Sequence, residues 1–308
     1  MDNQDEIFIS DELFDIPAVT EWNRKCSFLC FHLDYLPAIK KYFLNGWAID
    51  FGFPVAVLLI TISSYLIFIQ IDCYYLELNI YYQIVMTILV LLFLSCYVLG
   101  VLVGPGYIPY YYPRRYNKFQ GKEPDYLSEF VTNIEQKNYI KNHKYPAFCH
   151  YVSEARRIAI RPDHLCIWFS VFIGKLNYKF FLLFNMYGFL YITAFSVFQV
   201  LAMMRLVDSM VNPIYVIITI IYLLFGFVFS ILTCIFFFDS LHNTSRGTTN
   251  FEMLNKITNT NYHDGCCENF EEVCGPRENW FLWMLPIPAF WGMDVYSLTA
   301  ESDPYKML

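Results

Sequence analysis

Four long apolar stretches constrain this chain more than any other feature of its sequence. None of them contains Asp, Glu, Lys or Arg, and each has 20 to 25 residues: Phe51–Gln70, Ile80–Val103, Phe180–Met204 and Ile214–Phe238. At 1.5 Å per residue, such a stretch can cross a hydrocarbon core of about 30 Å. Because backbone polar groups in lipid must be satisfied within the segment, each stretch predicts a transmembrane helix. The expected fold class is an all-α membrane protein with four transmembrane helices.

The overall composition agrees with a membrane protein. Apolar residues make up 56% of the 308 residues and charged residues only 16%, whereas soluble domains have about 25% charged residues. This argues against the alternative that the helices form the buried core of a soluble protein. The first residues, "MDNQDEIFISDELFD", are acidic and lack the basic flank and short apolar segment of a signal peptide. The first helix is therefore expected to insert as an internal signal anchor. Nothing in the sequence indicates nucleic-acid binding.

The Lys and Arg content of the loops predicts the orientation. The loop between the first two helices has none, the loop between the last two has one, and residues 104–179 have twelve. Positively charged loops remain in the cytosol, so both termini and this long central loop are expected there. Five segments follow: a cytosolic N-terminal segment 1–49, helices 1 and 2 in 50–103, a cytosolic loop 104–179, helices 3 and 4 in 180–238, and a cytosolic tail 239–308. The expected location is an endomembrane, ER or Golgi.

The central loop carries a possible nucleophilic centre. Asp163, His164 and Cys166 lie within four positions. An imidazole can accept the proton of a thiol, and a carboxylate can hold that imidazole in the required tautomer. On a helix, His164 and Cys166 would point about 200° apart, whereas in a turn, which Pro162 favours, they can converge. The alternative is three solvated polar residues that share a loop next to the membrane.

The position of Cys166 indicates which substrate would suit it. The third apolar stretch begins fourteen residues later, at Phe180, so the thiol lies near the membrane surface. A fatty acyl thioester has a polar head and a long hydrocarbon tail, and each buried methylene contributes about 0.8 kcal/mol. Attack by the thiol on such a thioester, followed by transfer to another thiol, is covalent catalysis in two steps.

Around this triplet the sequence resembles the DHHC protein S-acyltransferases, whose signature is Asp-His-His-Cys-Pro-Trp followed by Asn-Cys-Val-Gly, Asn and Phe. An ungapped match retains Asp163, His164, Cys166, Trp168, Gly174, Asn177, Phe180 and Phe181, with Pro146 and His150 upstream. Three further segments are similar to family motifs and occur in the same order: "GPGYIP" at 104–109, "TTNFE" at Thr248–Glu252 and "NFEEVCG" at Asn269–Gly275. The resemblance covers roughly residues 50–290.

The resemblance implies protein S-palmitoyltransferase activity. It makes His164 the base, Asp163 the residue that orients it, and Cys166 the carrier of the acyl group. Palmitoyl-CoA would be the co-substrate, and the partners would be proteins with juxtamembrane cysteines and membrane lipid. The supporting motif residues would be Trp168, Gly174, Asn177, Thr248, Thr249, Glu252 and Asn269. For the two threonines and Glu252, ordinary helix capping remains an alternative.

Three basic residues of the central loop allow two interpretations. Arg156, Arg157 and Arg161 could bind the phosphates of coenzyme A. They could instead attract anionic lipid as part of a positive stripe. The sequence does not decide between these.

The zinc ligands of the family are replaced in this chain. The second His of the signature is Leu165, and the remaining ligand positions hold Asn138, Lys141, Tyr151, Val152, Ala155, Ile158 and Phe172. No Cys-x2-Cys pair occurs in the chain. The expectation is a protein without zinc or another cofactor, in which an apolar cluster buries itself beneath the Cys166 loop. That cluster would comprise Val152, Ala155, Ile158, Leu165 and Phe172.

Two other functions remain open from the sequence. A catalytically silent membrane scaffold of the same fold would lose catalytic and structural residues alike, but here the catalytic residues are retained. A small transporter would need ionisable residues inside the bundle. The predicted spans contain none, and their notable polar residues are Asn185 and Gln199.

Overall fold

The computed structural model describes residues 52–106, 148–152, 157–208, 212–257 and 265–290, and the backbone of four strands between residues 23 and 49. These residues fall into two compact units. One contains β1 to β6, and the other contains the long helices, the β7–β8 hairpin and the C-terminal helices. Of the residues of the central loop named in the sequence analysis, five lie outside these ranges: Asn138, Lys141, Pro146, Ala155 and Arg156.

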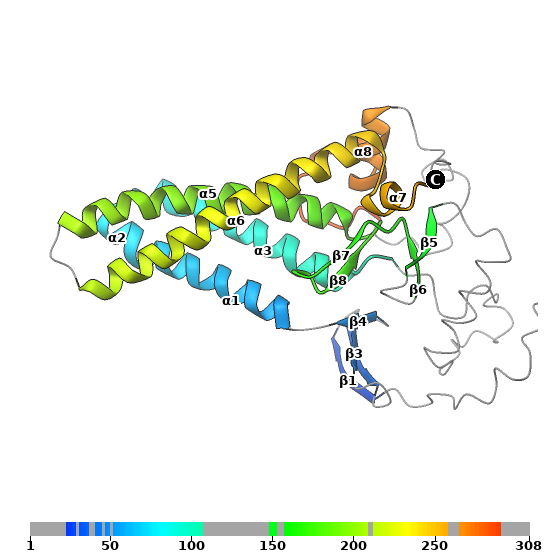
Figure 1. The fold of residues 1–308 in the computed structure, drawn as a ribbon, viewed down its shortest axis with the longest axis horizontal. Coiled ribbons are helices and arrows are strands. Elements are labelled where there is room, and N and C mark those ends of the chain that lie inside the picture. The colour runs from blue at the N-terminus through cyan, green and yellow to red at the C-terminus, as the bar shows by residue number, and fades with distance from the viewer. Residues whose placement is uncertain are drawn as a thin grey trace, which may run out of the picture. The chain divides into compact units, whose positions relative to one another are not determined.

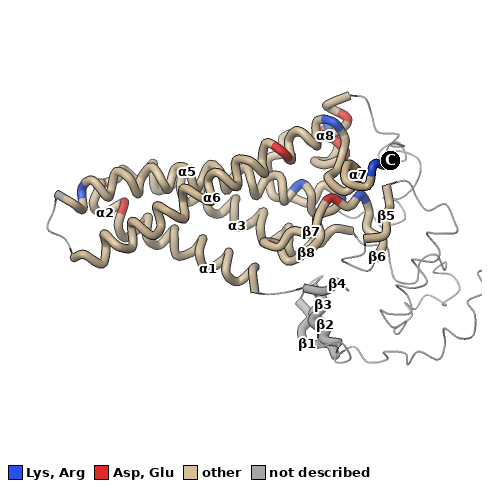
Figure 2. Tube along the Cα trace, in the orientation of Figure 1, with Lys and Arg blue, Asp and Glu red and all other residues tan. Residues whose placement is uncertain are grey.

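The helical unit contains four helices long and apolar enough to cross a membrane, which confirms the sequence prediction (Figure 1). The first span, Gly52–Tyr75, joins α1 (Gly52–Ile67), a π-helical turn η2 (Phe68–Asp72) and α2 (Cys73–Tyr75). The others are α3 (Ile80–Val103), α5 (Tyr178–Asp208) and α6 (Pro213–Arg246). Charged residues gather toward the ends of these helices (Figure 2).

Local sequence explains where the helices begin and end. The Asn79 side chain accepts the Tyr81 N–H (3.1 Å) and caps α3, and Asn212 accepts the Ile214 N–H (3.0 Å) in front of Pro213 at the start of α6. Such N-terminal caps satisfy backbone donors that have no partner within the helix. Gly247 ends α6 in the left-handed conformation, with φ of 64°.

Aromatic stacking and side-chain hydrogen bonds hold the bundle together. The rings of Phe93 on α3 and Phe184 on α5 stack with centroids 4.7 Å apart. The hydroxyls of Thr193 on α5 and Ser230 on α6 lie 2.6 Å apart. A Cβ at Gly226 would come within 2.4 Å of the Ser196 oxygen, so glycine there permits the close approach of α5 and α6.

Short strands accompany the helices that the sequence predicted. Strands β1 (Asn23–Phe28), β2 (Phe31–Leu36), β3 (Lys41–Leu44) and β4 (Trp47–Ile49) form an antiparallel sheet in the order β1-β2-β3-β4. β5 (Cys149–Val152) pairs with β6 (Arg157–Ile160), and β7 (His164–Cys166) pairs with β8 (Val171–Ile173). The short strands lack the length and alternation that would identify them by sequence alone.

Three predicted helix ends were too short. The first span continues past Gln70 through the π turn to Tyr75, α5 reaches Asp208, and α6 extends eight residues beyond Phe238. The prediction stopped at charged or polar residues, but Asp72 is fully buried and continues the helix. The remaining helices are α7 (Asn250–Leu254), α8 (Cys266–Cys274) and the 3-10 turn η4 (Arg277–Leu282).

Candidate active site

The β7–β8 hairpin brings His164 and Cys166 together. His164 pairs with Ile173 and Cys166 with Val171, while the Asp163 N–H donates to the Ile173 carbonyl (2.8 Å). Because side chains alternate along a strand, residues two apart lie on the same face. The sequence analysis expected a turn to achieve this, and that expectation was wrong in its geometry: a strand does it instead.

Asp163 is the carboxylate bonded to the His164 ring. It is 2% exposed, and its Oδ2 accepts the His164 Nδ1–H at 2.7 Å. Its Oδ1 accepts the backbone N–H of Asn250 at 2.6 Å, and the Asn250 side-chain amide donates to Oδ2 at 3.3 Å. The carboxylate therefore fixes the His164 ring with Nδ1 protonated and leaves Nε2 as the basic nitrogen.

The electrostatics of the site favour a charged His164. Burial lowers the pKa of His164, because it disfavours the charged ring. Hydrogen bonds to Asp163 and Cys166 and the negative charge of both groups raise it by more, so the pKa of His164 is about 9. The Phe181 ring lies edge-on to the imidazole, with centroids 4.9 Å apart. A ring with this pKa can hold the proton that the Cys166 thiol gives up.

The "TTNFE" segment positions the groups that hold Asp163. The Thr249 hydroxyl accepts the Glu252 N–H (3.2 Å), and the Glu252 carboxylate accepts the Thr249 N–H (2.9 Å). This capping box starts α7, whose first residue is Asn250. The sequence left helix capping and support of the active site as alternatives. The same segment does both, because it caps α7 and places the Asn250 N–H against Asp163.

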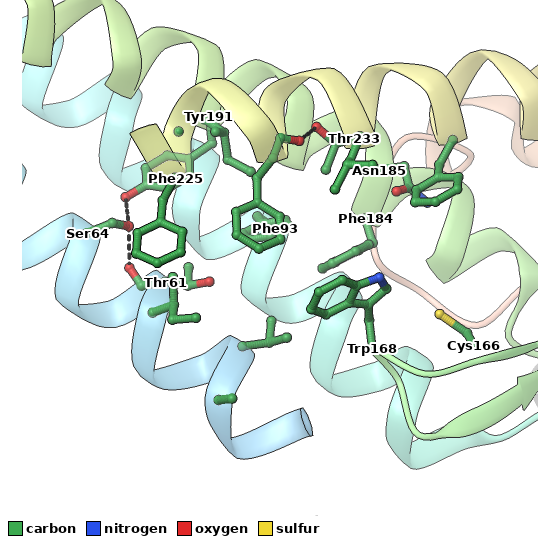
Figure 3. A pocket seen from close by; sticks show the side chains of 18 of the residues that line it. Thr61, Ser64, Phe93, Cys166, Trp168, Phe184, Asn185, Tyr191, Phe225 and Thr233 are labelled. Atoms are coloured by element: carbon green, nitrogen blue, oxygen red, sulfur yellow. Dashed lines mark hydrogen bonds between the residues drawn. The ribbon is translucent and has the colours of Figure 1, made fainter. Parts of the chain in front are cut away.

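An apolar cavity of about 430 Å³ opens beside Cys166 (Figure 3). His164, Leu165, Cys166, Ile167 and Trp168 line it at one end, and the rest of its wall comes from α1, α3, α5 and α6. The lining residues farthest from Cys166 along their helices are Ser64, Phe195 and Tyr222.

Hydrogen bonds between α1 and the helices α5 and α6 form a floor at the far end of the cavity. Ser64 donates to the Thr61 carbonyl (2.8 Å), so the Tyr191 hydroxyl, 2.9 Å away, donates to Ser64. Tyr222 donates to Ser63 in the same way at 2.7 Å. Cys166 thus lies at the opposite end of the cavity from this floor.

Comparisons with known proteins agree with this arrangement. Residues 132–257 match the family described as DHHC palmitoyltransferase. Over this segment the chain is similar to the DHHC palmitoyltransferases. Its relatives include "Probable protein S-acyltransferase 12" of Arabidopsis thaliana, 29% identical over 150 residues that cover 46% of this chain and 50% of the relative. "Palmitoyltransferase PFA3" of Debaryomyces hansenii is 27% identical over 172 residues, covering 46% and 41%. The chain spans about half the length of the curated relatives it matches.

The remaining DHHC-motif residues support the hairpin. Asn177, fully buried, accepts the Gly174 N–H (2.8 Å) and donates to the carbonyls of Gly100 (3.2 Å) and Phe172 (3.1 Å). The Trp168 carbonyl accepts the Tyr97 hydroxyl (2.7 Å). These bonds tie β8 and the hairpin tip to α3.

The Trp168 ring and Asn269 complete the set of DHHC-motif residues. The Trp168 ring lies edge-on to Phe53 of α1 and Phe229 of α6, with centroids 5.7 Å away in both cases. Asn269 of α8 donates to the Ser245 carbonyl at the end of α6 (3.0 Å). Thr248 donates its N–H to the Asn243 carbonyl (3.0 Å), and its hydroxyl oxygen is buried without a partner among the described residues.

Sequence reasoning missed several residues that support the DHHC site. Asn250 holds Asp163, and Asn243 donates to the Asn250 side-chain oxygen (3.3 Å). Lys175 pairs with Glu272, and Lys179 donates to the carbonyls of Leu282 and Ile287 (2.9 Å each). No local pattern marks these residues, because their partners are distant in sequence.

Of the three arginines, only Arg161 has a described side chain. Arg156 is not among the described residues, and of Arg157 only the backbone, in β6, is described. Arg161 is 7% exposed and belongs to the other unit. A role for them in binding coenzyme A phosphates remains a prediction.

The residues at the family's zinc-ligand positions do not fit a metal. Val152, Ile158 and Phe172 are buried, as expected, and carry no ligand atom. Leu165 is 50% exposed and lines the cavity, so its predicted burial was wrong: it faces the space beside Cys166. Within the described part of the chain, no group of three or more His, Cys, Asp or Glu side chains could hold a metal ion. The absence of zinc stays a prediction.

Proposed function

We propose that this protein is a protein-cysteine S-palmitoyltransferase that forms an acyl-enzyme at Cys166 from palmitoyl-CoA. The observation that carries this proposal is the placement of Cys166 between a His164–Asp163 pair and an apolar cavity. The family match and the names of the relatives support it.

The cavity suits a long acyl chain. Its lining runs along α5 from Phe181 to Phe195, fourteen residues, which correspond to about 21 Å of helix. An extended palmitoyl chain, with its fifteen carbon–carbon bonds, is comparable to this length. Transfer of such a chain into the cavity is favourable by about 0.8 kcal/mol for each methylene.

The first chemical step would form the acyl-enzyme. The Cys166 thiol transfers its proton to His164, while Asp163 stabilises the resulting imidazolium. The thiolate attacks the thioester carbonyl and forms a new carbon–sulfur bond. The bond to the sulfur of coenzyme A then breaks, and that sulfur receives the proton from His164.

The second step would return the enzyme to its starting state. A juxtamembrane cysteine of a substrate protein gives its proton to His164 and attacks the acyl-enzyme carbonyl. The bond to Cys166 breaks, the Cys166 sulfur receives the proton from His164, and the acyl group remains on the acceptor. Both steps exchange one thioester for another and need no oxidant, reductant or metal.

The membrane placement is part of the same proposal. With both termini and the site in the cytosol, as the loop charges predict, Cys166 would face the compartment that contains acyl-CoA. The host membrane would be ER or Golgi. A luminal site would be separated from this donor.

Labelling with an alkyne fatty acid tests the proposal. Wild-type protein should carry a label that hydroxylamine removes, and Cys166→Ser should carry none. Cys266→Ser combined with Cys267→Ser is the matched control, because both thiols are exposed and neither lines the cavity. Equal labelling of wild type and Cys166→Ser would instead favour the catalytically silent scaffold.

A further inference from the structure

A carboxylate is buried in the bundle beyond the floor of the cavity. Asp72 is fully buried, and Gln199 of α5 donates from Nε2 to both of its oxygens at 2.9 and 2.8 Å. The Gln199 Oε1 is buried and has no partner among the described residues. Ionisable groups inside a membrane bundle are costly and mark functional positions, and the proposed chemistry at Cys166 does not use this pair.

The Asp72–Gln199 contact and the Ser64–Tyr191 contact of the cavity floor join the same two helices at matching positions. Ser64 and Tyr191 are 127 residues apart in sequence, and Asp72 and Gln199 are also 127 apart. On both helices the second contact therefore follows the first by eight residues, about 12 Å at 1.5 Å per residue. The two contacts are successive links between the first span and α5.

The π turn explains how Asp72 reaches this position. In a regular α-helix, eight residues would carry Asp72 about 80° around the helix from Ser64. The π turn Phe68–Asp72 closes i→i+5 bonds and takes up an extra residue. Asp72 is thereby brought to about 20° from Ser64, the angle of a seventh residue in an α-helix. Such turns occur frequently at functional sites.

Aromatic packing links the pair to the floor. Phe68 is fully buried, and its ring lies 5.5 Å from that of Phe198, the neighbour of Gln199. The same Phe68 ring stacks on Tyr65, next to Ser64, at 6.3 Å. A shift of the first span at Asp72 would therefore also displace Ser64.

We propose that the Asp72–Gln199 pair is a positioning element that fixes the height and rotation of the first span against α5, and so sets how deep an acyl chain can enter. This inference rests on the proposed acyltransferase function and adds a determinant of acyl-chain length. Asp72 acts through the Ser64–Tyr191 floor and does not touch the acyl chain. Without the pair, the floor moves or opens, and longer chains fit.

The test is competition among acyl-CoA donors of twelve to twenty carbons. Purified full-length wild type, Asp72→Ala, Gln199→Ala and Asp72→Asn are each offered an equimolar mixture, and intact mass spectrometry identifies the hydroxylamine-labile acyl group on Cys166. Gln70→Ala is the matched control, because Gln70 is an exposed polar residue of the same π turn. A ratio of chain lengths does not depend on how much protein is folded.

Both alanine variants should favour longer chains. Space for two more methylenes should raise the ratio of eighteen- to sixteen-carbon product by up to about tenfold. Asp72→Asn should restore the wild-type profile, because its amide can accept from Gln199 Nε2 and donate to Oε1. Gln70→Ala should match wild type.

The possible failures are distinguishable. If wild type is acylated and Asp72→Ala has the same chain-length profile, this inference is wrong and the proposed function stands. A profile changed equally by Gln70→Ala also overturns it, since the effect would then belong to the π turn as a whole. A wild type that takes no acyl group on Cys166 removes the proposed function and this inference with it.

Discussion

The two ends of the helical bundle each bury a carboxylate, and their partners differ. Asp163 is bonded to the His164 ring and to Asn250, whereas Asp72 is bonded to the Gln199 amide. An imidazole can take up and release a proton near neutral pH, and an amide cannot. Burial of a carboxylate therefore does not by itself make a catalytic site. At the Cys166 end the partner allows acid–base chemistry, and at the other end it allows only positioning.

Replacing each carboxylate by an amide should separate the two ends most strongly. Asp163→Asn should slow acyl-enzyme formation by about 10²- to 10⁴-fold, because His164 loses the group that fixes its tautomer and stabilises its charge. Asp72→Asn should leave this rate close to wild type. Single-turnover acylation of Cys166, followed by intact mass spectrometry, measures both. Equal slowing by the two substitutions would contradict the distinction.

The sequence predicted the Cys166 end far better than the other end. Charge-free runs identified four spans, and the Asp163–His164–Cys166 triplet lies within one short segment. Asp72 escaped notice because it follows the first charge-free run, and only its distant partner Gln199 makes burial tolerable. Asn250 escaped for the same reason, since it is 87 residues from Asp163. Contacts between distant segments leave no local pattern to read.

Leu165 shows a different limit of sequence reasoning. Its replacement of a polar family residue suggested burial in an apolar cluster, as found for Phe172 directly opposite it in the hairpin. Leu165 is instead half exposed and lines the cavity. An apolar side chain can face a binding cavity as readily as a core, and the sequence does not distinguish the two.

A substitution that introduces a carboxylate without a partner at the Cys166 end tests the same comparison. Leu165→Asp would place a charge beside the entrance for an apolar chain, at a cost of about 2.5–3.5 kcal/mol if the site is lipid-like. Acyl-enzyme formation should then fall by up to about a hundredfold, with little change in unfolding temperature, because Leu165 is half exposed. Leu254→Asp, at an exposed position on α7, is the control. If Leu165→Asp unfolds and its folded fraction forms the acyl-enzyme at the wild-type rate, Leu165 has a structural role instead.

The pH dependence of stability should also differ between the ends. The pKa of His164 is raised from 6.5 to about 9, despite the opposing effect of burial, by its bonds to Asp163 and Cys166. A group whose pKa is higher in the folded protein than in the unfolded protein stabilises the fold. This contribution is complete below the unfolded-state pKa and is lost as the pH rises through the folded-state pKa. The unfolding temperature of wild type should therefore exceed that of His164→Gln most below pH 6.5, and the difference should shrink up to about pH 9. Ser64→Ala, toward the other end of the cavity, should show a constant difference over this range, because it removes a bond between two hydroxyl groups and no carboxylate or imidazole loses a partner. A constant difference for His164→Gln would be inconsistent with the His164–Asp163 pairing.

The capping box offers a smaller perturbation of the Cys166 end. Thr249→Ala removes the hydroxyl that accepts the Glu252 N–H, and loss of such a cap costs about 1 kcal/mol. Because α7 then holds the Asn250 N–H less firmly against Asp163, acylation should slow several-fold while the acyl-chain-length profile stays unchanged. Thr249→Ser keeps the acceptor and should behave as wild type. A change in chain-length profile would show that the two ends are coupled.

The smallest expected effect is that of a chelator. In the described residues, both ends are held by protein groups alone: Asp163 by His164 and Asn250, and Asp72 by Gln199. A structural zinc site needs four clustered thiolate, imidazole or carboxylate ligands, and the family's ligand positions hold apolar residues such as Leu165 and Phe172. Purified protein should therefore contain well under one zinc per chain by elemental analysis. A strong chelator should leave acylation and the unfolding temperature unchanged. Stoichiometric zinc, or inactivation that added zinc reverses, would mean that residues other than those at the family's positions bind the metal, and that the central loop depends on it.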